Sequence, residues 1–541
     1  MWWTHLFTAL LSSNVRRLAL SPAAAAVISA VLILTPARAY AQIIDVPAGG
    51  NLQQALNAVQ PGGTVRLQSG ATYVGSFTLP AKSGADASHY ILITTNTALP
   101  PAGTRIDPSY KSRLATIKSS TTISALATAA GASYYRIVGV AFDANKYGSG
   151  DVIALGRSDQ TTLTAVPHHI EIDRVLITGD PTVGQKRAIS ANASNVSIIN
   201  SDIRDIKADG QDSQCIAAWN SPGPFLIRNN YLEAAGENIM FGGAGIAITG
   251  VVPSDITVED NYMTKNQAWR GTKWTVKNIF ELKNARRVMV RHNVMQFNWG
   301  DAQVGFAIVL TPRNSDGHSP WVVVESVEFS GNVLIHSASA FNILGHDDTA
   351  SSKQLTNLVI RDNLFLDING SVWNGAGAFA QIGGEPANIT IDHNTVLHTG
   401  NIIIFYGGGY IDSSGAKVTG GPIKGFVFTN NLMHHNTYGI AGSGQAPGNG
   451  TLAFYAPGAI VQRNVMASDK SVASRYPPDN QFPTIAVYNT NFVNAAAQDF
   501  RLVSGSAYRG ASLDGRDLGC NFGLLPANAP PAPPNNIHVG Q

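Results

Sequence analysis

The stretch Val288-Met289-Val290-Arg291-His292-Asn293-Val294-Met295 decides the fold, because its pattern recurs along most of the chain. Each copy places apolar residues at alternate positions, then a polar residue, an Asn and a second apolar pair. Alternation with a period of two is typical of β-strands. The other strong copies centre on Asn230, Asn261, Asn332, Asn363, Asn394, Asn431 and Asn464.

The spacing of these Asn residues indicates a solenoid. From Asn230 onward the intervals are 31, 32, 39, 31, 31, 37 and 33 residues, and weaker copies precede them at Tyr135–Phe142, Ile170–Ile177 and Val196–Ile203. A repeat of about 20 to 50 residues is typical of solenoids and propellers. Each repeat here offers only two or three short strands, whereas a propeller blade needs four. We therefore predict an all-β, single-stranded parallel β-helix of about eleven coils, with the Asn residues stacked in an inward ladder.

A second strand follows each Asn strand, and its outward face is where a site is expected. The middle residue of each aligned triplet is apolar and is predicted to face the core, so its two neighbours share one outward face. The aligned triplets are Ala217-Ala218-Trp219, Met240-Phe241-Gly242, Glu281-Leu282-Lys283, Val309-Leu310-Thr311, Ile343-Leu344-Gly345 and Gln381-Ile382-Gly383.

The N-terminal segment reads as an export signal. Arg16-Arg17 precedes the apolar run Ala23–Leu34, and small residues follow at 37–41. This order is typical of a secretory signal peptide, and the run is shorter than the roughly 20 residues that span a bilayer. We predict a secreted or periplasmic protein that is cleaved after Ala41, with Ala39 as the alternative.

The rest of the chain divides by composition. An amphipathic segment, Leu52–Val59, is predicted to be a helix that caps the open N-terminal end of the stack. The predicted divisions are 1–41 signal peptide, 42–130 N-terminal cap and first coils, 131–470 coils that carry a groove, 471–525 C-terminal closing segment, and 526–541 disordered Pro- and Asn-rich tail.

Charge and cysteine content exclude several classes. The formal net charge is +2, but the signal segment holds three of the 37 basic residues and no acidic one. The remainder carries 34 basic and 35 acidic residues, so no basic footprint for nucleic acid is expected. Cys215 and Cys520 are the only cysteines, which excludes a disulfide framework. We expect a monomer.

The chain resembles the right-handed parallel β-helix proteins of the pectate-lyase-like superfamily, and is most similar to the branch with chondroitinase B and alginate lyases. Phe280-Glu281-Leu282-Lys283-Asn284 resembles that branch's lysine strand, and Thr311-Pro312-Arg313-Asn314 resembles its next coil. Leu282 replaces a common Ser, the Arg-His-Gly context is absent, and the Lys–Arg separation is longer.

The resemblance implies an exported lyase that cleaves a uronic-acid-containing polysaccharide by β-elimination. Lys283 is then the base and Arg313 assists, while Glu281, Glu237 and Asn238 hold Ca²⁺, which prefers oxygen ligands. The residues alone also permit plainer roles: a surface ion pair for Glu281 and Lys283, a turn residue for Glu237, and a loop-stabilising role for Arg313.

Two other functions stay open. His346, predicted to be catalytic, is followed by Asp347 and Asp348, and paired carboxylates near a His suit a glycoside hydrolase. The Asn-Thr-Asp strand and Gly-His-Gly turn of polygalacturonases are absent. A glycan-binding surface rod without catalytic activity is the third possibility.

Tryptophans point to a carbohydrate. Beyond the signal segment, all six lie between residues 219 and 373. Indole rings suit the apolar faces of sugars, although tryptophans also form the small cores of long loops. We predict substrate binding by Trp269, Arg270, Trp274 and Trp321.

Overall fold

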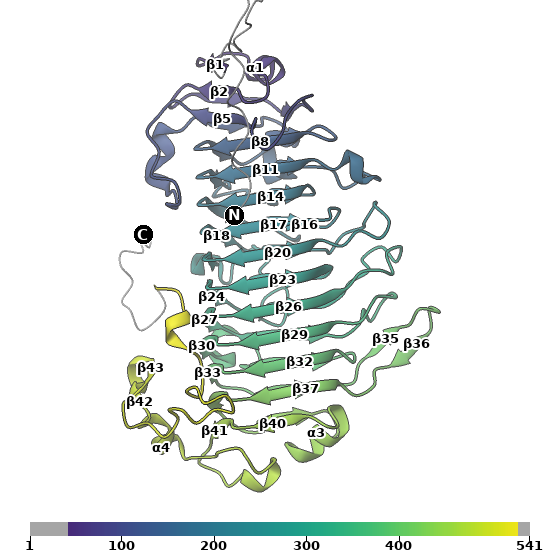
Figure 1. Cartoon of the computed structure of the whole chain (residues 1–541), viewed down its shortest axis with the longest axis vertical. Coiled ribbons are helices and arrows are strands. Elements are labelled where there is room, and N and C mark those ends of the chain that lie inside the picture. The colour runs from purple at the N-terminus through teal and green to yellow at the C-terminus, as the bar shows by residue number, and fades with distance from the viewer. Residues whose placement is uncertain (1–41, 528–541) are drawn as a thin grey trace, which may run out of the picture. The chain divides into compact units, whose positions relative to one another are not determined.

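The computed structural model describes residues 42–527, and these form one compact unit. The predicted signal segment and residues 528–541 of the predicted tail lie outside the described residues. Three long sheets run through this unit, and every neighbouring pair of strands within them is parallel (Figure 1). The all-β parallel β-helix is therefore confirmed.

Sheet 1 has fourteen strands and contains the first strand of each coil. In order, they are β1 (Ile43–Val46), β2 (Thr64–Leu67), β5 (Ile91–Thr95), β8 (Ser133–Val138), β11 (His168–Asp173), β14 (Ser194–Ile199), β17 (Phe225–Arg228), β20 (Ser254–Glu259), β23 (Ala285–Arg291), β26 (Val324–Ser330), β29 (Thr356–Arg361), β32 (Ala387–Asp392), β37 (Lys424–Thr429) and β40 (Ile460–Gln462).

Sheet 2 has thirteen strands and follows sheet 1 in each coil. They are β3 (Thr72–Val74), β6 (Thr116–Lys118), β9 (Ala141–Asp143), β12 (Leu176–Thr178), β15 (Asp202–Ile206), β18 (Tyr231–Ala234), β21 (Tyr262–Thr264), β24 (Val294–Asn298), β27 (Val333–Ser337), β30 (Leu364–Ile368), β33 (Thr395–His398), β38 (Leu432–His434) and β41 (Val465–Ala467).

Sheet 3 has twelve strands and completes the coil. They are β4 (Phe77–Leu79), β7 (Leu126–Thr128), β10 (Asp151–Leu155), β13 (Arg187–Ala191), β16 (Gln214–Ala218), β19 (Glu237–Phe241), β22 (Phe280–Leu282), β25 (Phe306–Leu310), β28 (Ser339–Leu344), β31 (Ala380–Gly383), β34 (Ile403–Phe405) and β39 (Ile440–Gly442).

The predicted Asn ladder lies at the bend between sheets 1 and 2. Asn363 is representative: its Oδ1 accepts hydrogen bonds from the backbone N and the Nδ2 of Asn332, at 2.9 and 3.1 Å. Its own Nδ2 donates to Phe329 O and to Asn394 Oδ1. The same bonds link all eight predicted residues from Asn230 to Asn464. Each side chain thus satisfies backbone groups at a bend that water does not reach.

Sheet 1 has three more strands than the eleven predicted copies. The coils that begin at β1, β2 and β5 do not carry the full motif, which therefore did not reveal them. The residue before each ladder position has positive φ, a conformation that Asn, Asp, His and Gly adopt more readily than most residues. These eight residues are Asn229, Asp260, His292, Gly331, Asp362, His393, Asn430 and Arg463.

The predicted alignment of sheet 3 is confirmed except at one coil. The inward residues Ala218, Phe241, Leu282 and Leu310 are in register, but the next one is Ile343 and not the predicted Leu344. Leu344 points outward and is still buried, because it covers the bare backbone at Gly384. Because leucine is typical of core positions, the sequence alignment placed Leu344 inward.

The ends of the stack are closed by separate elements. Helix α1 (Leu52–Ala58) places Leu52, Ala55 and Leu56 on the core of the first coils, which confirms the predicted cap. The C-terminal segment contains α4 (Ile485–Asn489) and the antiparallel pair β42 (Phe492–Asn494) and β43 (Asp499–Leu502). It packs on the outer face of sheet 2. The remaining helices are α2 (Gly370–Trp373) and α3 (Asn449–Tyr455).

Replacing Asn363 with Ala tests the ladder. The change leaves the buried backbone N–H of Asn332 without its acceptor and removes the amide that donates to Phe329 O and Asn394 Oδ1. Each buried group left without a partner costs about 1–3 kcal/mol. We expect the free energy of unfolding to fall by about 2–5 kcal/mol in chemical denaturation.

The matched control is Asn96→Ala. Asn96 is exposed, so its replacement is expected to change stability by no more than about 0.5 kcal/mol. Equal losses in the two variants would contradict a stabilising role for the ladder.

Candidate functional site

The connections between sheets gather at two edges of sheet 3, which we name by their side chains. The lysine edge joins sheet 3 to sheet 1 and comprises residues 242–253, 283–284, 311–323, 345–355 and 406–422. The tryptophan edge joins sheet 2 to sheet 3 and comprises residues 265–279, 299–305 and 369–379. The outward face of sheet 3 lies between them.

Lys283 and Glu281 form a buried ion pair on this face. Glu281 is the middle residue of β22, and Lys283 follows the strand at the lysine edge. The Lys283 Nζ lies 2.7 Å from Glu281 Oε1, and the exposed fractions of the two side chains are 20% and 1%. The contact is close but poorly directed, because neither Glu281 oxygen accepts a hydrogen bond from a described residue. This pair is far less solvated than the surface ion pair that the residues alone permitted.

Glu237 lies one coil before Glu281 and is equally buried. Its Oε2 accepts a hydrogen bond from Gln214 at 2.9 Å, while Lys277 Nζ lies 3.8 Å from its Oε1. Burial, reinforced by the charge of Glu281, raises the pKa of Glu237 to about 8. We call Glu237, Lys277, Glu281 and Lys283 the carboxylate–lysine cluster.

The cluster fits a cation only in part. Glu237 Oε1 and both oxygens of Glu281 are buried acceptors without hydrogen bonds, which is the ligand chemistry that Ca²⁺ uses. Asn238 was predicted as the third ligand. Its amide nitrogen donates to Leu232 O and Thr264 O, while its Oδ1 is a further buried acceptor without a hydrogen bond. Within residues 42–527, no three Asp, Glu, His or Cys side chains form a metal-binding group. A cation here would be held by two carboxylates.

A lysine that the sequence analysis did not single out supports this cluster. Lys265 is fully buried, and its ammonium lies within hydrogen-bond distance of four carbonyl oxygens, those of Ala234, Ala235, Gly236 and Asn278. Burial lowers the pKa of Lys265 to about 7. The bonds fix the turn that leads into Glu237. No sequence signal distinguishes this lysine from a surface one.

Arg313 is adjacent to Lys283 in the backbone, but its side chain points to the next coil. The Arg313 N donates to Lys283 O at 2.9 Å. Its guanidinium pairs with Asp347 at 2.6 Å and Asp348 at 2.5 Å. Two carboxylates therefore already neutralise the arginine that was expected to assist at a uronate carboxylate.

His346 completes this second group. Its ring stacks on Tyr410, with centroids 4.2 Å apart. Burial lowers the pKa of His346, so the imidazole is neutral at pH 7. We call Arg313, His346, Asp347 and Asp348 the arginine cluster. Glu281, Lys283, Arg313 and His346 do come from three consecutive coils, yet their side chains divide between two clusters.

The tryptophans are placed differently from their predicted role. Trp269 and Trp274 expose only 4% and 8% of their surface and pack with Trp299 and Trp373 at the tryptophan edge. They form the core of the loops there and offer no open face to a sugar. Of the predicted binding residues, only Trp321 lies at the lysine edge.

Arg270 and Trp321 also contact the loops in which they lie. The Arg270 guanidinium lies 5.2 Å from the centre of the Trp373 ring and donates to Val372 O, so it ties two loops together. Trp321 is half-buried and donates from Nε1 to Val251 O at 3.1 Å. Its ring packs on Val251 and Val322 in the loops beside Lys283.

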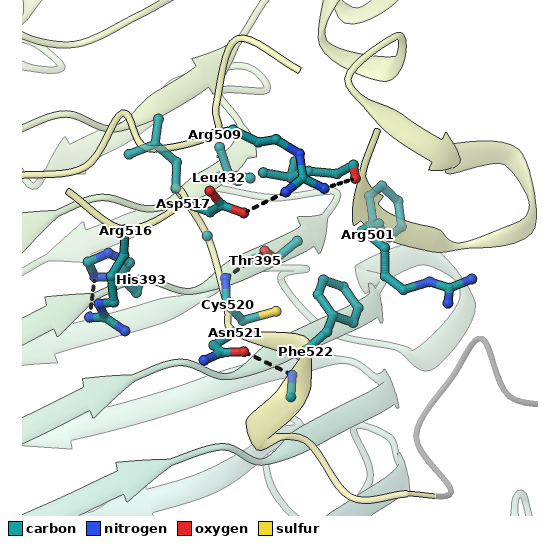
Figure 2. Close-up of a pocket in the computed structure, with 15 residues that line it drawn as sticks. His393, Thr395, Leu432, Arg501, Arg509, Arg516, Asp517, Cys520, Asn521 and Phe522 are labelled. Atoms are coloured by element: carbon teal, nitrogen blue, oxygen red, sulfur yellow. Dashed lines mark hydrogen bonds and ion pairs between the residues drawn. The ribbon is translucent and has the colours of Figure 1, made fainter. Parts of the chain in front are cut away.

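A separate cavity of about 390 Å³ lies under the C-terminal segment (Figure 2). Its arginines are paired, for example Arg509 with Asp517 at 3.5 Å, and Arg516 lies beside His393. Burial raises the pKa of the Cys520 thiol there to about 12, which removes it as a nucleophile. The cavity therefore holds no group prepared for catalysis.

Comparison with known proteins agrees with the fold. No protein-family model matches the chain, and no curated protein sequence does. A mannuronic acid specific polysaccharide family 6 lyase from human gut microbiota is 14% identical, with a TM-score of 0.52 over 81% of this chain and 91% of that one. The PL6 family alginate lyase AlyGC is 14% identical, with a TM-score of 0.55 over 90% of this chain and 57% of that one. At this identity the similarity shows the right-handed parallel β-helix fold alone.

The raised pKa of Glu237 predicts a dependence of stability on pH. Between its ordinary value of 4.5 and about 8, folded Glu237 keeps a proton that the unfolded chain releases. The free energy of unfolding should therefore fall as pH rises through this window, by up to about 1.4 kcal/mol per pH unit.

Glu237→Gln removes this titration and should flatten the profile from pH 5 to 8. Chemical denaturation at a series of pH values measures it for both proteins. Parallel profiles would show that Glu237 is ionised in the folded protein.

Proposed function

We propose that this protein is a polysaccharide lyase that cleaves a uronic-acid-containing polysaccharide by β-elimination. The observation that carries the proposal is the pairing of Lys283 with the buried Glu281 on the outward face of sheet 3. Long loops flank that face, and loops on a rigid scaffold are where catalytic sites usually lie. The mannuronic acid specific lyase and the alginate lyase that share the fold support the same chemistry for this chain.

The bond changes define the role of Lys283. Its neutral amine removes the proton on the carbon next to the sugar carboxylate, a carbon–carbon double bond forms, and the bond to the 4-linked oxygen breaks. That oxygen leaves as a hydroxyl after taking a proton from solvent. Lysine has an ordinary pKa near 10.4, so it acts as a base only after its own proton has left. In this site that proton passes to solvent, and a cation on Glu281 would favour its loss because it offsets the charge of the carboxylate.

The other predicted residues take supporting roles. Ca²⁺ bound by Glu237 and Glu281 would neutralise the substrate carboxylate and so acidify the adjacent proton. Arg313 holds the 347–349 turn at the lysine edge through Asp347 and Asp348, and we assign it a positioning role. His346 is a neutral imidazole at the same edge, and its buried Nδ1 has no partner among the described residues.

A panel of acidic polysaccharides separates the candidate reactions. A lyase produces an unsaturated sugar that absorbs in the ultraviolet, whereas a hydrolase produces reducing ends without that absorbance. Binding without either product would indicate the glycan-binding rod. Alginate is the first substrate to include.

Lys283→Ala tests the base. We expect the rate constant kcat to fall by about 10²- to 10⁴-fold, the usual contribution of general base catalysis. Lys283→Arg should be nearly as damaging, because a guanidinium does not release its proton. A chelator should abolish activity, and added Ca²⁺ should restore it.

The matched control for this test is Lys273→Ala, since Lys273 is an exposed lysine at the tryptophan edge. Its kcat should stay within twofold or so of the parent. Full activity in Lys283→Ala would reject this site and turn attention to His346 and the two aspartates.

We also propose export with residues 1–41 as the secretion signal, and action as a monomer. No helix in the described part of the chain is long and apolar enough to cross a membrane. N-terminal sequencing of the exported protein should begin at Gln42. A mature chain that retains Met1 would contradict cleavage.

A further inference from the structure

The outward face of sheet 3 continues beyond Lys283 as a line of groups that suit a sugar. Glu281 pairs with Val309 on the next strand, Val309 with Asn342 on the one after it, and Asn342 with Gln381 on the strand beyond. Asn342 and Gln381 are half-buried, and Gln381 Nε2 lies 3.4 Å from Asn342 Oδ1. Side-chain amides both donate and accept hydrogen bonds, as sugar hydroxyls do.

The next residue in register with Gln381 is Ile404 on β34, and Tyr406, two residues further along, lies beside the end of this line. It follows β34, and its ring lies against the backbone of Gly383 on the preceding strand. A Cβ on Gly383 would lie 2.3 Å from Tyr406 Cζ, so only glycine leaves room for the ring. Tyr406 is half-buried, which leaves part of its surface open. An aromatic ring laid on a sheet in this way resembles a platform for the apolar face of a sugar.

The surroundings of Tyr406 hold it in place. Burial raises the pKa of Tyr406, opposed by a hydrogen bond between its hydroxyl and Gln381, and Asp348 and Arg313 of the arginine cluster lie within electrostatic range. Gly407, Gly408 and Gly409 follow, and the chain then enters the hairpin of β35 (Gly409–Ile411) and β36 (Lys417–Thr419), which projects beside β37 (Figure 1). The hairpin is anchored by Tyr410 on His346 and by the bond from Ile411 N to Asp347 O.

We infer that Asn342, Gln381 and Tyr406 form a distal sugar-binding subsite for the polysaccharide that Lys283 cleaves. The inference rests on the proposed function. A sugar ring stacks on Tyr406, while its hydroxyls bond to the two amides and to the exposed Asp348.

Charge decides how this subsite recognises its sugar. Asp347 and Asp348 outnumber Arg313, and His346 is neutral, so the arginine cluster carries a net negative charge. The subsite therefore binds the ring face and hydroxyls and not the carboxylate. Its contribution to affinity should depend little on salt, because salt screens exposed charges and not stacking.

Distance decides which substrates reach it. Tyr406 follows a strand four steps along sheet 3 from the strand that Lys283 follows, which is roughly 19 Å at the spacing of paired strands. A short oligosaccharide placed at Lys283 ends before Tyr406, while a longer one contacts both. The subsite thus adds affinity only above a threshold of chain length.

The test compares variants over a series of oligosaccharides of increasing length, prepared from the polysaccharide that the panel shows to be degraded. We expect Tyr406→Ala to raise KM for the longer members by about 3- to 10-fold, the effect of losing one aromatic contact, with kcat unchanged. The shortest cleaved member should show no change. Tyr406→Phe should behave as the parent protein.

Two further variants serve as controls. Tyr406→Leu keeps an apolar cover on Gly383 if the alanine variant is unstable, and should lose the same affinity. Tyr147→Ala removes an exposed tyrosine far from this face, between sheets 2 and 3, and should change nothing. A KM shift of equal size for every length, or no shift at all, would overturn the subsite.

This outcome is separable from failure of the proposed function. Full activity in Lys283→Ala rejects the lyase site, whatever Tyr406 does. If no polysaccharide is degraded, titration of the same panel's oligosaccharides into parent protein and Tyr406→Ala still measures the binding difference. Equal affinities in that titration would reject the subsite alone.

Discussion

The structure depends on how each coil satisfies its backbone where the chain turns inward from sheet 1 to sheet 2. A buried N–H or C=O without a partner costs as much as a lost hydrogen bond, and this bend occurs in every coil. The Asn ladder meets the requirement by bonding each bend to the next, from Asn230 to Asn464. Because the ladder fixes the register of successive coils, it also fixes which residues share the outward face of sheet 3.

This register assigns the inward positions of each coil to the core and leaves the outward positions and loops available for function. Inward positions repeat the same apolar residues, so outward positions and loops are free to differ from coil to coil. At the tryptophan edge the long loops bury Trp269 and Trp274 and so stabilise themselves. At the lysine edge the loops surround charged groups, and Lys283 is held beside a carboxylate that water scarcely reaches. The two edges therefore serve different purposes.

The sequence revealed the repeating part of the molecule and missed what depends on contacts between coils. Asn spacing predicted the β-helix and its ladder, and a period of two placed Glu281 and Lys283 on one outward face. The alignment of sheet 3 was wrong at Leu344, which points outward but is buried against the backbone of Gly384. The sequence analysis also placed tryptophans on a substrate face, because burial inside a loop leaves no periodic signal.

The same limit applies to the site. Adjacent coils were predicted for Lys283 and Arg313, but the direction of the Arg313 side chain follows from its pairing with Asp347, which lies 34 residues away. Lys265 and Tyr406 carry no local motif, since the first is defined by four carbonyls and the second by the space above Gly383. Such roles emerge only when the coils are stacked.

The most direct test of the account is a crystal structure of the Lys283→Ala variant with a long oligosaccharide of its substrate bound. The account predicts a chain lying along the outward face of sheet 3, with one sugar beside position 283 and another stacked on Tyr406. A chain bound elsewhere, such as in the cavity under the C-terminal segment, would contradict it.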